Sequence, residues 1–188
     1  MRLTGTIRAD LPLLVVALDE EAAQLGDALP VLITGVGKVR AATAVARLLA
    51  TRSPAYVVNI GTAGGLRHGL DGVHEVGTVI QHDFASAAIE SVTGIGFGPP
   101  IRLQSDGLTL ATGDQFVAGG PVRDALAAQA DLVDMEGYAV AAACLEAGVV
   151  ARLVKLVSDD ADEHALRSWV DTVADHAHTL ARWIDANL

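Results

Sequence analysis

Three clusters of carboxylates follow short apolar stretches of the sequence, at residues 19–21, 134–136 and 158–160. Acidic residues at helix starts stabilise the helix dipole, and this alone would account for a single cluster. Three clusters at three predicted strand ends exceed what helix starts require. Because two separated carboxylates can act as acid and base on one substrate, the pattern predicts general acid–base chemistry without assigning the two roles.

Two glycine-rich segments, at residues 34–38 and 61–65, also follow predicted strands. The first has neither the glycine spacing of a phosphate-binding loop nor the third glycine of a dinucleotide-binding fingerprint. Each segment is either a tight turn or a place where the backbone closely approaches a ligand, and the sequence leaves both interpretations open. In the second segment, the Thr62 hydroxyl and exposed amides could hold a hydroxyl, a water or an anion.

Other reaction classes lack the residues that they need. The acidic run at residues 159–163, with His164, has no second ligand set at a recognisable spacing, so we expect no metal and no cofactor. The absence of a Gly-x-Ser-x-Gly elbow disfavours an α/β-hydrolase. Cys144 is the only cysteine, and without an evident basic neighbour we expect it to be a small buried residue.

The composition is typical of one globular domain, which we assign to residues 1–188. Its 23 acidic and 13 basic residues give a net charge of −10, which argues against a nucleic-acid surface and an anionic-membrane surface. The apolar run at residues 11–18 is too short to span a bilayer, and it lacks the cationic start and cleavage site of a signal peptide. We therefore expect a cytoplasmic protein with neither a nucleic-acid nor a membrane partner.

Apolar strand patterns alternate with helical patterns along the chain. The predicted strands span residues 13–18, 31–34, 56–60, 77–81, 109–112, 132–135 and 151–158, and the predicted helices span 39–49, 121–129, 136–147 and 164–187. Glycines and prolines favour a loop over residues 85–106. This alternation predicts an α/β sandwich with a mostly parallel sheet. Ligands of such folds bind beyond the carboxyl ends of the strands, where the carboxylates and glycines could share one pocket.

Six segments resemble, in order, the motifs of the nucleoside phosphorylase superfamily. They are ALDEE at 17–21, GVGKV at 35–39, NIGTAGG at 59–65, GDQFV at 113–117, VDME at 133–136 and SDDAD at 158–162. They are most similar to the hydrolytic branch, the 5′-methylthioadenosine/S-adenosylhomocysteine nucleosidases. The resemblance implies a three-layer sandwich whose central mixed, mostly parallel sheet is flanked by helices. It also implies a homodimer that hydrolyses the N-glycosidic bond of a small purine nucleoside.

The resemblance further implies a role for individual residues. Glu21 matches the base that activates water, and Asp159 matches the acid that protonates purine N7, oriented by Ser158. Glu136 matches the residue that binds the ribose hydroxyls. The other substrate-binding positions are Thr62 near the water, Phe116 and Val117 at the base, Met135 beneath the sugar, Trp169 at the 5′ substituent, and Ala63, Gly64 and Asp134.

The sequence also departs from these relatives. Asn59 stands where the phosphorylases carry a phosphate-binding arginine, so the resemblance favours water over phosphate as the nucleophile. Lys155 stands where the nucleosidases carry an arginine thought to help hold the water, and lysine cannot copy its planar fork. A hairpin before residue 35 and a helix between residues 98 and 113 are missing, which leaves the identity of the nucleoside open.

Four functions follow from these observations. The leading one is hydrolysis of 5′-methylthioadenosine or S-adenosylhomocysteine. The alternatives are hydrolysis of another purine nucleoside such as a futalosine-type compound, a phosphate-dependent phosphorylase, and a non-catalytic nucleoside-binding protein. Base release with and without phosphate distinguishes them.

Overall fold

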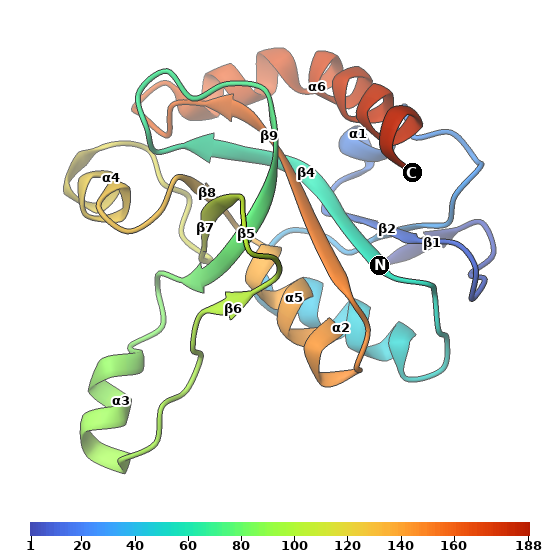
Figure 1. The fold of residues 1–188 in the computed structure, drawn as a ribbon. Coiled ribbons are helices and arrows are strands. Elements are labelled where there is room, and N and C mark those ends of the chain that lie inside the picture. Colours follow the sequence, from blue (N-terminus) through green and yellow to red (C-terminus); the bar gives the residue numbers. More distant parts are fainter.

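The computed structural model describes residues 1–165 and 175–188, and between them it gives only the helical course of the backbone. In the described chain, one mixed sheet of nine strands runs through the molecule (Figure 1). Its longest strands are β4 (Val57–Gly65), β5 (Val73–Gln81) and β9 (Ala151–Asp159), with nine residues each. All three are rich in valine, whose branched side chain suits a pleated and buried surface.

Five strands of this sheet close into a ring. β9 pairs with β4 in parallel and with β5 antiparallel. β5 pairs with β7 (Leu108–Thr112), β7 with β8 (Leu132–Asp134), and β8 returns to β4. The predicted α/β class with a central mixed sheet is confirmed, but a plain three-layer sandwich does not describe this barrel-like part. Strand twist allows long strands that pair along both edges to curl until they meet, and the shorter predicted strands concealed this closure.

The remaining part of the sheet is open. It extends from β4 through β2 (Leu13–Val16) and β3 (Val31–Ile33) to β1 (Arg2–Thr4), and the short β6 (Ile101–Arg102) pairs with β5. β2 lies parallel to both β3 and β4. Because β9 is also parallel to β4, the carboxyl ends of β2, β4 and β9 lie at the same edge of the sheet.

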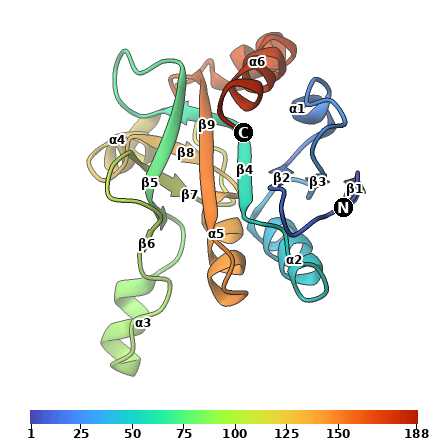
Figure 2. The same ribbon diagram turned by 45° about the vertical axis from the view of Figure 1, so that its right-hand side comes forward.

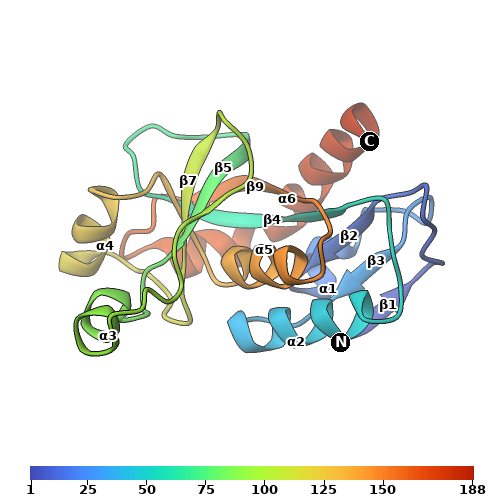
Figure 3. The same cartoon turned by 60° about the horizontal axis from the view of Figure 1, so that its bottom comes forward.

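Helices cover both faces of the sheet (Figure 2, Figure 3). They are α1 (Asp19–Ala22), α2 (Lys38–Leu49), α3 (Ser86–Thr93), α4 (Gly120–Ala127), α5 (Gly137–Glu146) and α6 (Ala165–Asn187). α2 packs against α5 on one side, and α6 packs against β9 and α1 on the other. α3 extends away from the other elements (Figure 1) and has no buried residue. Within the described residues, no helix combines the length and the apolar character that crossing a membrane requires.

The residues of β2 show how the two faces are filled. Leu13 and Val15 belong to the core cluster that contains residues of α2 and α5. Leu14 and Val16 belong to the cluster that contains Leu180 of α6. Burial on both faces explains why this strand is apolar at every position, as the sequence pattern indicated.

Two expectations from the sequence are wrong in part. Residues 61–65 do not form a turn but continue β4 to its end at Gly65. Glycines usually weaken a strand, but pairing with β9 on one edge and β8 on the other supports these residues. Residues 86–93, expected within a loop, form α3, because the glycines of this region begin only at Gly94, which ends the helix with φ of 68°.

Candidate functional site

A cavity of about 330 Å³ opens where β2, β4, β8 and β9 end. Its described lining residues are Ala17, Leu18, Glu21, Val36, Thr62, Ala63, Gly64, Gln115, Phe116, Val117, Val133, Asp134, Met135, Glu136, Ser158 and Asp159. The structure therefore brings together every predicted site residue except Trp169, which lies outside the described residues.

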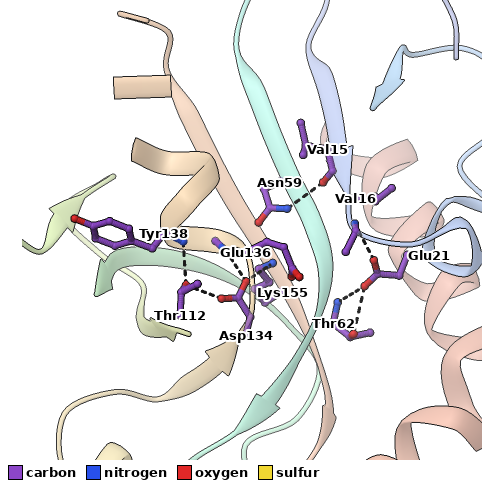
Figure 4. A network of polar contacts seen from close by, with 12 residues as sticks. Val15, Val16, Glu21, Asn59, Thr62, Thr112, Asp134, Glu136, Tyr138 and Lys155 are labelled. Atoms are coloured by element: carbon purple, nitrogen blue, oxygen red, sulfur yellow. Dashed lines mark hydrogen bonds and ion pairs between the residues drawn. The ribbon is translucent and has the colours of Figure 1, made fainter. Parts of the chain in front are cut away.

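Four hydrogen bonds orient Glu21, which lies in the short α1 directly after β2 (Figure 4). Its Oε2 accepts from the backbone N–H groups of Ala17 at 3.1 Å and Leu18 at 3.2 Å. Its Oε1 accepts from the Thr62 N–H at 3.0 Å and from the Thr62 hydroxyl at 3.3 Å. Both carboxylate oxygens of Glu21 accept hydrogen bonds, and the residue is only 5% exposed. The carboxylate is therefore fixed against the end of β4.

The glycines of β4 make room for carboxylates. A Cβ on Gly61 would lie 2.8 Å from Glu21 Oε1, and a Cβ on Gly64 would lie 3.2 Å from Asp159 Oδ1. These positions require close approach of side chains from other elements, which a residue with a Cβ would obstruct. Of the two interpretations of residues 61–65, the structure supports close approach rather than a turn.

Ser158 and Asp159 both line the cavity although they are adjacent in β9. Regular alternation would direct their side chains to opposite faces of the sheet. However, Val157 pairs with Ala63, whereas Asp159 pairs with the next residue of β4, so Ser158 is an extra residue in a β-bulge. Ser158 Oγ donates to Asp159 Oδ2 at 2.7 Å, and the Ala161 N–H donates to Oδ1 at 2.9 Å.

Glu136 lies between β8 and α5 and is 9% exposed. Its Oε1 accepts from the Gly37 N–H at 2.8 Å. Burial raises the pKa of Glu136 to about 8, and the negative charges of Asp134 and Glu21 add to the rise. The Lys155 charge and the Gly37 hydrogen bond act in the opposite direction. A carboxyl group of this kind changes its protonation near neutral pH, as functional groups in clefts often do.

Asp134 also lines the cavity, but the protein itself engages its carboxylate. Oδ1 accepts from the Thr112 hydroxyl at 2.6 Å, and Oδ2 accepts from the Gly137 N–H at 2.8 Å. Oδ2 forms an ion pair with Lys155 Nζ at 2.9 Å, and both side chains are 2% exposed. Asp134 therefore has a supporting position in the cavity wall, and its predicted contact with substrate stays a prediction.

The loop after β7 supplies the aromatic part of the wall. Phe116 is 50% exposed, so its ring is accessible from the cavity, whereas Val117 beside it is buried. Met135 adds an apolar side chain from the segment after β8. Aromatic and apolar surfaces of this kind suit a planar ligand.

Sequence reasoning did not select five of the lining residues. They are Ala17, Leu18, Val36, Gln115 and Val133. Each lies inside one of the six motif segments, so the segment rather than the single position carried the signal. Gly37, whose backbone N–H donates to Glu136, was likewise not selected although it lies inside a motif segment.

Among the described lining residues there is no lysine, arginine or histidine. Asn59 faces elsewhere, since its Nδ2 donates to the Val15 carbonyl at 3.0 Å. Lys38 donates to Gln81 Oε1 at 3.2 Å and forms an ion pair with Asp83. The described residues contain no group of three or more His, Cys, Asp or Glu side chains suited to a metal ion.

Known proteins are similar to this chain in sequence and in fold. The family model described as the phosphorylase superfamily matches residues 21–186. A 5′-methylthioadenosine/S-adenosylhomocysteine nucleosidase of Marinomonas sp. (strain MWYL1) is 31% identical over 166 residues, which cover 72% of this chain and 70% of that protein. An aminodeoxyfutalosine nucleosidase of Helicobacter pylori (strain J99) is 36% identical over 77 residues, which cover 40% of this chain and 34% of that protein.

The solved structures show the same fold. A mutant of the futalosine hydrolase of Helicobacter pylori strain 26695 superposes with a TM-score of 0.83 at 20% sequence identity. The superposition covers 94% of this chain and 97% of that one. Together with the family match over most of the sequence, this establishes that the chain belongs to the phosphorylase superfamily.

Proposed function

We propose that this chain hydrolyses the N-glycosidic bond of a purine nucleoside, and that its substrate is 5′-methylthioadenosine or S-adenosylhomocysteine. The observation that carries the proposal is the placement of Glu21 and Asp159 in one cavity, over Gly61 and Gly64 of a single strand. Two carboxyl groups in one cavity can supply the base and the acid that hydrolysis of a glycosidic bond requires.

The two acids divide the proton transfers between them. Glu21 accepts a proton from water as the water oxygen attacks the anomeric carbon of the ribose. The bond from that carbon to purine N9 breaks, and its electron pair moves into the base. Asp159 donates a proton to purine N7, so that the base departs neutral. Positive charge develops on the sugar in this transition state, and the carboxylates of the cavity wall stabilise it.

The remaining lining residues hold the nucleoside. Phe116 stacks on the base, and the backbone of Val117 hydrogen-bonds its edge. Met135 packs beneath the sugar, Glu136 accepts from the ribose hydroxyls, and Ser158 orients the acid. The other proposed substrate-binding positions are Thr62, Ala63, Gly64, Asp134 and, at the 5′ substituent, Trp169.

Water is the nucleophile because the cavity is unsuited to a phosphate anion. Its described lining includes the carboxyl groups of Glu21, Asp134, Glu136 and Asp159, but no cationic side chain. A phosphate here would meet the carboxylate of the proposed base Glu21, with no cationic side chain in the described lining to offset the repulsion. This electrostatic pattern supports a hydrolase over a phosphorylase.

A second candidate substrate is an aminodeoxyfutalosine-type nucleoside. The observation that favours it is the 36% identity, over 77 residues, with the Helicobacter pylori aminodeoxyfutalosine nucleosidase. Protonation at N7 by Asp159 serves either substrate, because it does not involve the 5′ substituent. Competition between the two nucleosides for the same enzyme decides which one is preferred.

The direct test is base release from methylthioadenosine, S-adenosylhomocysteine, adenosine and inosine, with and without phosphate. We expect release without phosphate, fastest for one of the two thio compounds. Release that depends on phosphate would overturn the hydrolytic mechanism. Failure to release any base while adenine still binds would overturn these substrates and leave two outcomes, a non-catalytic binding protein or an untested nucleoside of the aminodeoxyfutalosine type.

Matched substitutions test the assigned acid and base. Glu21→Gln and Asp159→Asn should each abolish release and spare the fold. Their exposed neighbours provide controls, and Glu20→Gln and Asp160→Asn should retain activity. Full activity of either Glu21→Gln or Asp159→Asn would refute the corresponding role.

The proposal extends to a cytoplasmic homodimer. The observation in favour of the dimer is a set of exposed apolar side chains on and beside α3, which otherwise lacks a buried face. They are Phe84, Val92, Ile95 and Phe97. Light scattering of the purified protein measures the mass, and a monomer at micromolar concentration would contradict the dimer.

A further inference from the structure

Lys155 is a fully buried lysine in the middle of β9. It is absent from the described lining of the cavity, so the mechanism above gives it no contact with substrate. Burial of an ammonium group is costly unless the charge is paired and hydrogen-bonded. The buried charge therefore calls for an explanation in terms of the groups around it.

The partner of Lys155 is the carboxylate that organises the start of α5 (Figure 4). Asp134 Oδ2 forms an ion pair with Lys155 Nζ at 2.9 Å and accepts a hydrogen bond from the Gly137 N–H at 2.8 Å. Thr112 donates its hydroxyl to Asp134 Oδ1 at 2.6 Å and accepts from the Tyr138 N–H at 2.9 Å. Side chains of β7 and β8 thus bind the first two amides of the helix, and the Asp134 contact to Gly137 closes a turn.

Glu136 lies inside that closed turn, two residues after Asp134. We propose that Lys155 is a positioning residue for Glu136: by anchoring and neutralising Asp134, it holds the turn that presents Glu136 to the ribose hydroxyls. The inference rests on the proposed function and adds to it the residue that fixes the sugar contact.

Charge supports the same assignment. The acidic groups that act on Lys155 are Asp134 from β8, Glu136 before α5 and, more weakly, Glu21 from α1. Burial lowers the pKa of Lys155, but these carboxylates outweigh burial and raise it, so the side chain stays charged. Without this cation, the negative charge of Asp134 would raise the pKa of Glu136 further, and the turn would lose the ion pair that anchors Asp134.

The test measures how strongly the enzyme depends on a ribose hydroxyl. The readout is the ratio of kcat/KM for methylthioadenosine to kcat/KM for its 2′-deoxy analogue. Lys155→Met should lower this ratio by about ten-fold or more, the effect of losing a hydrogen bond to a charged group. Lys155→Arg, which keeps the charge, should preserve most of the ratio. The N-glycosidic bond of the 2′-deoxy analogue is intrinsically more labile, but this affects the ratio equally in every variant and so cancels when variants are compared.

Two further variants separate positioning from general stability. Arg152→Met removes another ion pair of β9, to Glu75 at 2.6 Å, and should leave the ratio unchanged. Lys155→Gln, which keeps a donor for Asp134 but not the charge, replaces Lys155→Met if that variant does not fold, and should also lower the ratio. In a Glu136→Gln background, a substitution of Lys155 should have no further effect on the ratio.

The outcomes distinguish this inference from the proposed function. If the unaltered chain releases no base from any nucleoside, the proposed function is overturned and this inference with it. If the unaltered chain is active but the neutral variants of Lys155 keep the wild-type ratio, the inference alone is overturned. An equal loss of activity on both substrates would show a merely structural lysine and would also overturn it.

Discussion

Gly61 lies directly against the Glu21 carboxylate: a Cβ at residue 61 would be 2.8 Å from Glu21 Oε1. A side chain at this position therefore has to displace the acid. Glu21 is bound through both oxygens to the N–H groups of Ala17, Leu18 and Thr62, so displacement would disturb several contacts together. The missing side chain at Gly61 is thus part of the geometry of the proposed base.

Gly61→Ala should consequently lower kcat by about ten-fold to a hundred-fold, because a displacement of ~1 Å in a catalytic group has effects of that order. The measurement is base release under saturating substrate. Gly96→Ala is the matched control, since a Cβ at residue 96 would meet nothing closer than 3.8 Å. A kcat equal to that of the control would show that Glu21 does not need its observed position.

Ser158→Ala should lower kcat with little change in KM. The substitution removes the hydrogen bond from Ser158 Oγ to Asp159 Oδ2 and leaves the Ala161 N–H as the donor to the other oxygen. An acid with one anchor samples wrong orientations, and we expect a loss of about ten-fold. Steady-state kinetics measures the effect, and Ser105→Ala, which changes an exposed serine outside the described cavity lining, is the control. A change confined to KM would argue that Ser158 contacts substrate instead.

Glu136 should make the fold less stable as the pH rises. Its pKa is about 8 in the folded protein against an ordinary value of 4.5. Its favourable contribution is therefore complete below pH 4.5 and is lost as the pH rises through 8. The expected loss in the free energy of unfolding is on the order of a few kcal/mol, since each pKa unit corresponds to ~1.4 kcal/mol.

Urea unfolding at about pH 5 and about pH 8 measures this dependence. Glu136→Gln should remove most of it, whereas Glu146→Gln, which changes an exposed glutamate of α5, should leave it intact. An identical pH dependence in the unaltered protein and in Glu136→Gln would show that Glu136 ionises normally in the fold.

Cys144 should resist thiol reagents in the native protein. Burial raises the pKa of its thiol to about 12, and it packs in the cluster between α2, α5 and the sheet. The thiolate that reacts with a disulfide reagent is therefore scarce and inaccessible. Absorbance with an aromatic disulfide should show one thiol released in denaturant and almost none without it. Rapid labelling of the native protein would mean that α5 opens readily.

The sequence predicted the members of the cavity better than their arrangement. Glu21, Glu136 and Asp159 stood in recognisable local motifs, and local order was enough to find them. That Ser158 and Asp159 face the same way depends on a register shift against Ala63, which no local pattern encodes. The pairing of Lys155 with Asp134 depends on two strands that do not pair with each other, so only the three-dimensional structure shows it.

The same difference between local patterns and long-range pairing applies to the fold. The longer helices α2, α4, α5 and α6 and most strands were predictable because their periodicity is local. The four-residue α1 is too short to show a helical period, and α3 was obscured by the glycines and prolines that follow it. The closed ring was not predictable, because it depends on which strands pair with β9 rather than on the sequence of β9 itself. Asp134 shows the consequence for the site: the motif marks its position, but its hydrogen bonds with Thr112 and Gly137 are visible only in the structure.

The central position of β9 constrains how the chain can reach its native state. Val57 pairs with Ala151 and Glu75 pairs with Val154, so β9 inserts between two strands that are synthesised much earlier. Until then β4 and β5 each have an edge without its native neighbour, which exposes them to pairing with other chains. Contacts so distant in sequence slow folding. Nascent chains that stop short of residue 151 should therefore depend on chaperones, and the cavity can form only after the ribosome has released β9.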